Sequence, residues 1–180
     1  MTELLVDDVA PFEDWASAAR ASLAFLHRTV GLDVWVVTEV REPLQVVLHS
    51  HPQEVLPPGT SITWSRSFCH TMVSGEGPRV ATVAAATPAY RDLETGLPQR
   101  VAAYMGVPLV TQRGELFGTL CGLSVRAQPR ALARFLPTVE MTARMLSTML
   151  PETLPSSLRP GQVPAQRGAS ASAAMRARPT

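Results

Sequence analysis

The sequence predicts an α+β domain built on a central antiparallel β-sheet of about five or six strands. Two pairs of apolar runs rich in strand-forming residues are each joined by a short polar link, which is typical of β-hairpins. Amphipathic helices are expected before the first pair and after the second. The strands lead these two helices to the same side of the sheet, where we expect them to lie antiparallel.

Residues 101–125 (VAAYMGVPLVTQRGELFGTLCGLSV) form the clearest of these hairpins. The polar residues 112–115 join the two apolar arms, and Gly114 can supply the positive φ that a tight reversal needs. Both arms are too continuously apolar for a sheet with one solvated face, so we expect them at the centre of a sheet covered on both sides. Gly118 and Gly122 share one face of the second arm, where glycine often marks the close approach of another backbone or a ligand.

The first helix is expected over residues 12–30. Pro11 suits its first helical position, and Gly31 is a typical helix end. The apolar residues of this segment alternate between spacings of four and three, and they are Phe12, Ala16, Ala19, Leu23, Leu26 and Val30. Strands should follow at 34–40 and 44–50, and the short link between them predicts an antiparallel hairpin.

Two histidines, His49 and His51, stand at the end of the second strand. The two-residue period of a strand places them on one face, but no Cys or carboxylate at metal-ligand spacing accompanies them. The sequence therefore predicts no metal site here, and we expect both imidazoles to face solvent. A short strand at 61–64 should follow.

A helix is predicted over residues 65–73, with its first residue, a serine, as the N-cap. Phe68 and Met72 lie four residues apart, so they share one helical face and should pack on the sheet. Cys69 and His70 cannot both share that face.

A further strand is predicted at 79–86, followed by a short helix that Thr87 caps and Pro88 begins. The final helix should run from Pro129 to Pro151. Its apolar stripe steps by three and four along Leu132, Phe135, Val139, Thr142, Leu146 and Met149, widened by Leu136 and Leu150. Met141, Met145 and Met149 also follow helical spacing, and because a methionine stripe is usually core we assign no metal or cofactor to it.

Composition and charge bound the class of protein. The chain has 180 residues, of which 46% are hydrophobic, which suits one domain plus a tail. All 16 basic residues are Arg and the chain has no Lys or Asn, which indicates a bacterium of high genomic GC content. Two Cys, no apolar signal core and no membrane-spanning run predict a reduced, cytoplasmic protein without a disulfide.

The chain divides into an N-terminal lead at 1–11, one domain at 12–150 and a basic tail at 151–180. Residues 1–150 carry 12 Arg against 14 acidic residues, whereas the tail carries 4 Arg against one Glu. The domain is therefore not expected to bind nucleic acid. The tail is rich in Pro, Ser and Ala and has few large apolar residues, so we expect it to be disordered.

Several motifs resemble those of GAF domains. Residues 104–109 (YMGVPL) and 116–123 (LFGTLCGL) resemble the closing strands of that family. Three further segments are similar to other parts of that family. Residues 67–70 (SFCH) resemble its middle helix, residues 79–82 (RVAT) its middle strand, and residues 87–92 (TPAYRD) its lid segment. The resemblance covers about residues 12–150 and implies a GAF/PAS-like sheet, with short helices and lid loops on the face opposite the terminal helices. GAF domains bind cyclic nucleotides, bilins, haem, small acids or no ligand, so the ligand and any cofactor stay unknown.

The resemblance also supplies candidate ligand-binding residues, because the lid segment of a GAF domain lies over the open face of the sheet. The candidates near a pocket mouth are Tyr90, Arg91, Arg100 and Tyr104, and Cys69 and His70 join them. A guanidinium facing a partly desolvated cleft favours a weakly anionic ligand. Arg91 is equally consistent with a surface ion pair to Asp92. The cyclic-nucleotide subtype is disfavoured because its recognition set includes Asn and Lys.

The preferred function is a non-catalytic sensory or regulatory module, because no catalytic triad, phosphate loop, paired carboxylates or metal set is evident. The alternative is a thiol enzyme of the free methionine sulfoxide reductase type, with Cys69 and Cys121 as its two thiols. Against it, Cys121 lies in an apolar run where burial raises a thiol pKa. A second alternative is a bilin-binding photoreceptor attached at Cys69, although in that class the Cys-His pair lies in a later helix.

A homodimer is expected through the first and last helices. Their apolar stripes, at Leu23, Leu26 and Val30 and at Leu146, Met149 and Leu150, are broader than one sheet face requires. In GAF proteins such helices commonly extend into a dimer bundle. No output domain is evident in the chain, so we expect it to signal through a partner protein, with no membrane or nucleic acid involved.

Overall fold

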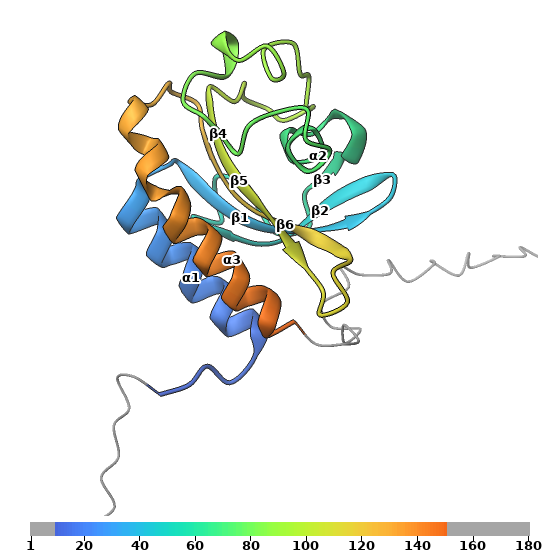
Figure 1. Ribbon diagram of the computed structural model, residues 1–180, viewed down its shortest axis with the longest axis vertical. Coiled ribbons are helices and arrows are strands. Elements are labelled where there is room, and N and C mark those ends of the chain that lie inside the picture. The colour runs from blue at the N-terminus through green and yellow to red at the C-terminus, as the bar shows by residue number, and fades with distance from the viewer. Residues whose placement is uncertain (1–9, 151–180) are drawn as a thin grey trace, which may run out of the picture.

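The computed structural model describes residues 10–150, which are organised around a six-stranded antiparallel sheet of order β3-β2-β1-β6-β5-β4 (Figure 1). The strands are β1 (Val34–Arg41), β2 (Leu44–His51), β3 (Ser61–Thr63), β4 (Val80–Ala81), β5 (Ala103–Val110) and β6 (Leu116–Ser124). Both predicted hairpins are present, as β1–β2 and β5–β6. The predicted fold class is confirmed, whereas the tail at 151–180 and most of the N-terminal lead lie outside the described residues.

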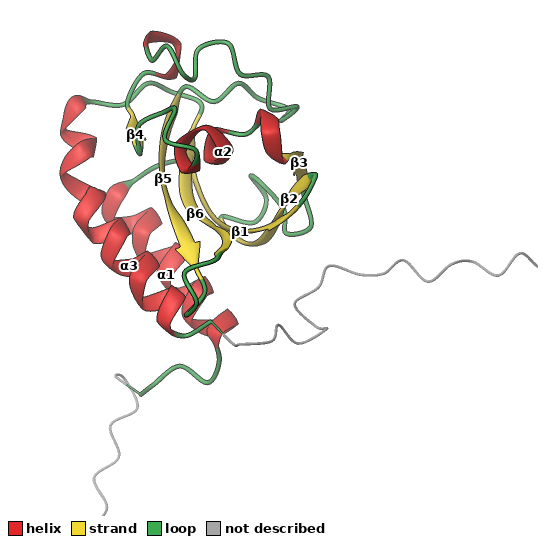
Figure 2. Ribbon diagram, turned by 45° about the vertical axis from the view of Figure 1, so that its right-hand side comes forward, coloured by secondary structure: helices red, strands yellow, loops and turns green. Residues whose placement is uncertain are grey.

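The helices cover the two faces of the sheet unequally. The long helices α1 (Trp15–Val30) and α3 (Leu136–Thr148) lie side by side on one face, as Figures 1 and 2 show. The short α2 (Phe68–Val73) lies on the other face. The Trp15 indole N–H donates to the Leu146 carbonyl at 3.0 Å, which joins the start of α1 to the end of α3. The two helices are therefore antiparallel on one side of the sheet, as predicted.

Two hydrophobic cores lie on the two faces of the sheet, and they are supplied by alternating residues of the same strands. In β6, Leu120 belongs to the core under α1 and α3, and the adjacent Cys121 belongs to the core under α2. In β1, Trp35 faces the long helices and Val36 faces α2. This confirms the expected burial of the central strands on both sides. β6 is central and β5 lies next to the short edge strand β4.

The two glycines of β6 lie where other groups approach closely. A Cβ atom at Gly122 would lie 2.6 Å from Leu32 Cδ1 and 2.8 Å from the Trp35 ring. A Cβ atom at Gly118 would overlap the carbonyl oxygen of Thr38, in the neighbouring strand. The close approach expected from the sequence is confirmed at both positions.

The first helix begins later than predicted, at Trp15 rather than at Pro11. Asp14 is its N-cap and accepts a hydrogen bond from the Ser17 backbone N–H at 2.7 Å. The carboxylate satisfies a backbone donor of the first turn that an earlier start would leave unpaired. Phe12 therefore lies outside the helix and is exposed. The helix ends at Gly31 with a φ of 79°, as expected.

The region between the hairpins contains less regular structure than predicted. The N-cap of α2 is Ser67, which accepts from His70 N–H at 3.0 Å, and the predicted first turn from residue 65 is part of a 3-10 helix (Trp64–Arg66). The strand predicted at 79–86 is reduced to β4, and the chain then enters a 3-10 turn (Ala84–Ala86). Thr87 donates back to the Val83 carbonyl and begins a turn rather than a helix.

The final helical segment is divided in two. A 3-10 helix (Arg130–Phe135) precedes α3, with Pro137 in the first turn of α3. Proline has no backbone N–H, so the α-helical ladder cannot pass through this position and starts again there. The prediction that the methionine stripe is core is wrong, because Met141, Met145 and Met149 are 57%, 61% and 40% exposed.

The histidines of β2 do not face solvent as predicted. A bulge after Val37 shifts the register of β1 against β2, and α1 covers the face on which both imidazoles lie. The ring of His49 lies 6.0 Å from that of Trp15, and the ring of His51 lies 5.1 Å from that of His27. Burial lowers the pKa of His49. The predicted shared face is confirmed, but it is partly buried.

Substitution of the β6 glycines tests this close packing. We expect Gly122→Ala to destabilise the fold by about 1–3 kcal/mol, because two side chains must shift. Gly118→Ala should cost more, since the obstructing atom belongs to the backbone of β1. Urea unfolding measures both, with Val110→Ala, at an exposed position of β5, as the control. Equal midpoints for the two glycine variants would contradict this account.

Candidate functional site

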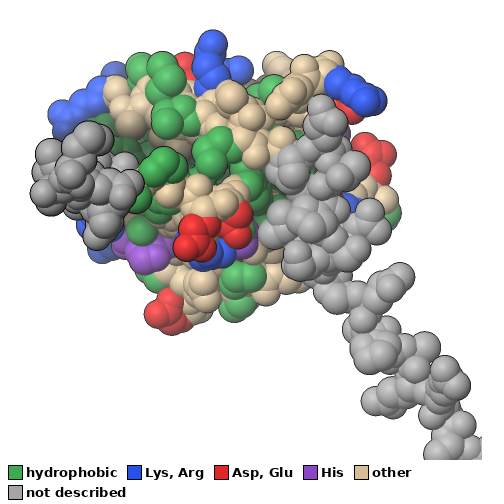
Figure 3. Space-filling view, turned by 90° about the horizontal axis from the view of Figure 1, so that it is seen from below, with side chains coloured by type: hydrophobic (Ala, Val, Ile, Leu, Met, Phe, Trp, Pro, Cys, Tyr) green, Lys and Arg blue, Asp and Glu red, His purple; other side chains and the backbone are tan. Residues whose placement is uncertain are grey.

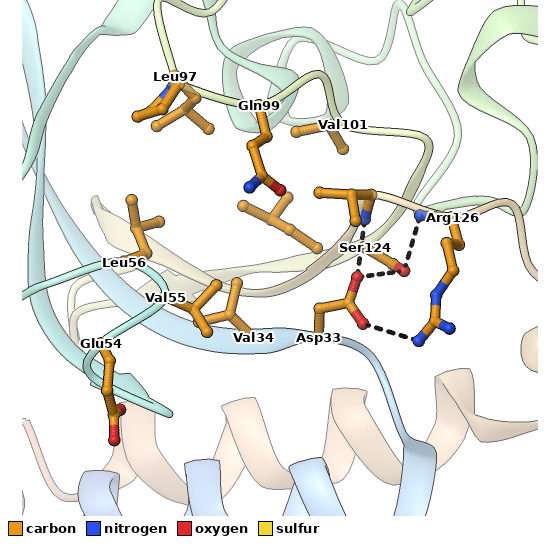
Figure 4. Close-up of a pocket in the computed structure, with 13 residues that line it drawn as sticks. Asp33, Val34, Glu54, Val55, Leu56, Leu97, Gln99, Val101, Ser124 and Arg126 are labelled. Atoms are coloured by element: carbon orange, nitrogen blue, oxygen red, sulfur yellow. Dashed lines mark hydrogen bonds and ion pairs between the residues drawn. The ribbon is translucent and has the colours of Figure 1, made fainter.

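A cleft of about 520 Å³ opens on the side of the sheet away from α1 and α3. Its walls come from the start of β1, the loop after β2, the loop before β5 and the end of β6 (Figure 4). The apolar part of the lining includes Val34, Val55, Leu56, Leu97, Val101 and Leu123. Most of this surface is hydrophobic, so the cleft suits a small molecule with a largely apolar body.

A group of hydrogen-bonded polar residues lies along one side of the cleft, and Glu54 lies on the opposite wall (Figure 4). Asp33 accepts hydrogen bonds from the Ser124 hydroxyl and the Val125 N–H, each at 2.8 Å, and lies 3.6 Å from the Arg126 guanidinium (Figure 4). Burial raises the pKa of Asp33, but these hydrogen bonds outweigh it and the net shift is downward. The Gln99 side chain points into the cavity between the two walls. Gln99 and Arg126 thus contribute hydrogen-bond donors to the lining of the cleft.

A smaller cavity of about 30 Å³ adjoins this cleft, and the two share part of their lining: Leu56, Leu97, Val101 and Leu123. Thr38 and Gln45 line its inner part together with Cys69 and Cys121. Cys69 comes from α2 and Cys121 from β6. This inner cavity has room for about one water-sized molecule.

The structure brings the two predicted thiols together, with their Sγ atoms 3.5 Å apart and both side chains buried. The Thr119 hydroxyl donates to Cys69 Sγ at 3.2 Å, and the Tyr104 hydroxyl does so at 3.6 Å. The Gln45 amide donates to the hydroxyls of Thr38 and Thr119, at 2.8 and 3.0 Å. Buried polar groups of the sheet therefore form one network that ends on the sulfur of Cys69.

This network separates the pKa values of the two thiols. The hydrogen bond from Cys121 and those from Gln45, Thr119 and Tyr104 favour the thiolate of Cys69, and they lower its pKa to about 6 although burial opposes the shift. The hydrogen bond to Cys69 and burial raise the pKa of Cys121. The elevated pKa predicted for Cys121 agrees with its surroundings.

The two predicted tyrosines are core residues. Tyr90 and Tyr104 are 1% and 0% exposed and pack against the Phe68 ring, at 4.8 and 5.4 Å. Burial raises the pKa of both phenols. The prediction that they lie at a pocket mouth is wrong, because α2 covers them. Tyr104 instead orients a hydroxyl toward Cys69, in space that a side chain at Gly106 would occupy.

The predicted arginines lie together on the surface, and neither lines the cleft, although Arg100 lies between the lining residues Gln99 and Val101. Arg91 contacts Asp92 at 3.0 Å, and Arg100 donates to the Arg91 carbonyl at 2.9 Å. Arg91 therefore forms the surface ion pair that the sequence left open as an alternative. His70, the remaining candidate, packs its ring 5.2 Å from that of Trp64.

The scan of protein families matches one model, described as GAF domain, over residues 14–150. The chain belongs to the GAF family. No curated protein matches the sequence. Within residues 10–150, no group of three or more His, Cys, Asp or Glu side chains is arranged to hold a metal ion. In the same part of the chain, no helix combines the length and the hydrophobicity that crossing a membrane requires.

Solved GAF structures share this fold at low sequence identity. The GAF domain of an Acinetobacter phosphoenolpyruvate-protein phosphotransferase has a TM-score of 0.59 and 16% identity, over 79% of this chain and 84% of that chain. A free methionine-R-sulfoxide reductase from Neisseria meningitidis has the same TM-score, 20% identity and coverages of 79% and 81%. The second GAF domain of DevS from Mycobacterium smegmatis has a TM-score of 0.53, 17% identity and coverages of 75% and 94%.

Sequence reasoning missed the polar network and most of the cleft. Thr38 and Thr119 interrupt otherwise apolar strands, which is a signal that buried hydroxyls need partners. Their partner Gln45 gives no such signal, because it stands at the polar start of β2. The cleft walls at 54–56 and 97–101 lie in loops without a motif, and only the folded chain brings them together.

Titration of the thiols tests the network. Ultraviolet absorbance of the thiolate measures the titration, and we expect one thiolate to form with a midpoint near pH 6. Thr119→Val should raise that midpoint because it removes a hydrogen-bond donor to Cys69. Thr119→Ser keeps the hydroxyl, so it should leave the midpoint unchanged. Relative to an unfolded thiol near 9.0, the lowered pKa makes folding stability rise between pH 6 and 9 and removes that contribution below pH 6. A single midpoint near pH 9 in all three proteins would contradict the assignment.

Proposed function

We propose that this GAF domain is a non-catalytic sensory or regulatory module that binds a small, largely apolar molecule in the 520 Å³ cleft. The observation that carries the proposal is the cleft itself, whose volume is in the usual range for small-molecule sites. Its lining is mostly apolar, and Asp33 already pairs with neighbouring groups rather than facing the cavity as a free base. The cleft would recognise its ligand mainly by shape, and Gln99 and Arg126 would bind a polar or weakly anionic end of that ligand.

The residues proposed to bind the ligand therefore differ from those predicted from the sequence. Tyr90 and Tyr104 are buried against Phe68. On the surface, Arg91 pairs with Asp92 and Arg100 donates to the Arg91 carbonyl. The cleft residues that replace them come from the loops before β5 and after β2. The expectation of a small apolar or weakly anionic ligand stays, carried by different residues.

A thiol enzyme is the second candidate, and the contact between Cys69 and Cys121 is the observation that favours it. The reductase from Neisseria meningitidis, solved in complex with its substrate, has the same fold. Neither sulfur lines the 520 Å³ cleft, however; both face the inner cavity of about 30 Å³. A free amino-acid sulfoxide is too large for a space that holds about one water-sized molecule. The same volume argues against a bilin attached at Cys69.

We further propose that the protein is a homodimer that signals through α1 and α3, alone or with a partner protein. Most stripe residues named from the sequence do not carry this proposal, because Leu23, Leu26 and Leu146 are buried in the core. The exposed apolar surface consists of Met141 and Met145 on α3, Met149 directly after it, and Phe25 on α1, which is 44% exposed. Figure 3 shows hydrophobic side chains reaching the surface on the lower side of the molecule. Exposed apolar patches of this kind typically mark interfaces.

Binding of a fluorescent probe tests the cleft. Anilinonaphthalene sulfonate has an apolar body and one anionic group, and we expect its fluorescence to rise with the folded protein. Val55→Trp should weaken this binding roughly tenfold, a loss of ~1.4 kcal/mol, because the indole fills the cleft. The matched control is Val83→Trp, at a similarly exposed valine outside the cleft. Equal loss in both variants, or no binding to the parent protein, would reject the cleft as a ligand site.

Sedimentation tests the dimer. We expect the parent protein to sediment as a dimer at micromolar concentration and Met145→Glu to sediment as a monomer, because an unpaired carboxylate in the interface is costly. Thermal unfolding should show that the variant still folds, since Met145 is exposed. Leu116→Glu, at an exposed residue of the β5–β6 hairpin, is the control and should stay dimeric. A monomeric parent protein would end the proposal.

A further inference from the structure

The thiol pair has a geometry that the ligand-binding function does not use. Cys69 and Cys121 are 52 positions apart in the sequence, yet their sulfur atoms lie 3.5 Å apart between α2 and β6. Both are free thiols. The S–S bond of a disulfide is about 2.0 Å long, so an approach of about 1.5 Å would join them. Rotation of two side chains, together with a small shift of α2, can supply that approach.

The two sulfurs are not equivalent. Cys69 accepts hydrogen bonds from the hydroxyls of Thr119 and Tyr104, which stabilise negative charge on its sulfur. Thr119 is itself held by Thr38 and Gln45. For Cys121, the hydrogen bond to Cys69 and burial outweigh the contribution of Thr119, and the net shift of its pKa is upward. Cys69 is therefore the nucleophilic thiol, and Cys121 is the resolving thiol that can attack oxidised Cys69.

The cavity beside this pair adjoins the open cleft. The inner cavity at the sulfurs holds about one water-sized molecule, and it shares four lining residues with the open cleft. Hydrogen peroxide, with two oxygen atoms, is among the smallest oxidants, and it donates and accepts hydrogen bonds as water does. The polar groups at the inner end, Thr38 and Gln45, suit a small hydrogen-bonding molecule.

We propose that Cys69 and Cys121 form a peroxide-sensitive redox pair that closes to an intramolecular disulfide. In the first step, Cys69 Sγ attacks one peroxide oxygen, the O–O bond breaks, and the second oxygen leaves with a proton as water. The sulfur, oxidised by two electrons, is then a sulfenic acid. In the second step, Cys121 Sγ attacks the Cys69 sulfur, the S–O bond breaks, and the hydroxyl leaves with the Cys121 proton as a second water. Two thiols and one peroxide thus give one disulfide and two waters.

The disulfide would link α2 to the central strand of the sheet. Phe68 and Ser67, beside Cys69, also line the inner cavity, so movement of α2 toward β6 changes the inner end of the cleft. Oxidation would also remove the sulfur acceptor that the Thr119 and Tyr104 hydroxyls use in the reduced state. This redox step does not require the proposed ligand, and it stands if the cleft binds nothing.

The test is peptide mass spectrometry of the full chain after treatment with one equivalent of hydrogen peroxide. Trypsin cleaves after Arg, so Cys69 falls in the peptide 67–79 and Cys121 in the peptide 114–126. We expect both thiols to disappear together and these two peptides to be recovered joined, with two hydrogen masses lost. Reduction should restore them. The peptide-level readout is necessary because Met141, Met145 and Met149 are exposed and oxidise independently.

Two variants separate the steps. Cys121→Ser should stop at a Cys69 sulfenic acid, which dimedone added together with denaturant after removal of the peroxide captures, and Cys69→Ser should leave Cys121 unreacted. The proposal is overturned if both thiols persist in the treated parent protein, if the variants react equally, or if disulfides form only between chains. It is also overturned if oxidation accelerates with low urea in proportion to global unfolding, since the reactive form would then be the unfolded chain.

Discussion

The burial of the central strands on both faces is the constraint on which the rest of the structure depends. β6 pairs with β1 along one edge and with β5 along the other, so its backbone groups are used within the sheet. Its side chains then alternate between two cores, with Leu120 under the long helices and Cys121 under α2. Glycine at 118 and 122 lets neighbouring groups approach where a side chain would obstruct them. An apolar hairpin of this kind is stable only when both layers are present.

This two-sided burial also creates the site. Thr38, Gln45 and Thr119 lie in a buried sheet face without access to bulk water, so they satisfy one another, and the chain of hydrogen bonds ends on Cys69. A sheet with a solvated face would hydrate these groups and leave the thiol without fixed donors. The short α2 and its loops cover less area than α1 and α3 do, and the cleft lies on their side of the sheet. Ligand cleft and thiol pair are thus consequences of one incompletely covered face.

The two sides of the sheet therefore have separable roles. The side of α1 and α3 is packed with apolar residues and presents exposed methionines on its outer surface. The opposite side holds the cleft, the inner cavity and the two cysteine sulfurs. Since β6 contributes to both cores, a displacement of α2 acts on the same strand that supports α3 and α1. If the cleft binds a ligand as proposed, this shared strand connects it physically to the helical side.

The sequence by itself determined the fold, because the period of apolar residues and the turn chemistry of Gly31 and Gly114 are local properties of the chain. It also determined that both faces of the hairpins are buried, since arms without polar alternation cannot tolerate water. Element ends were less predictable where a better cap or a proline competed, as at Asp14 and Pro137. Only the tertiary structure decided that Tyr104 is covered, that loops far apart in sequence enclose a cleft, and that two cysteines touch. These outcomes depend on which side chains of different helices, strands and loops come into contact. The spacing of residues along the chain does not encode how far apart they lie in the folded protein.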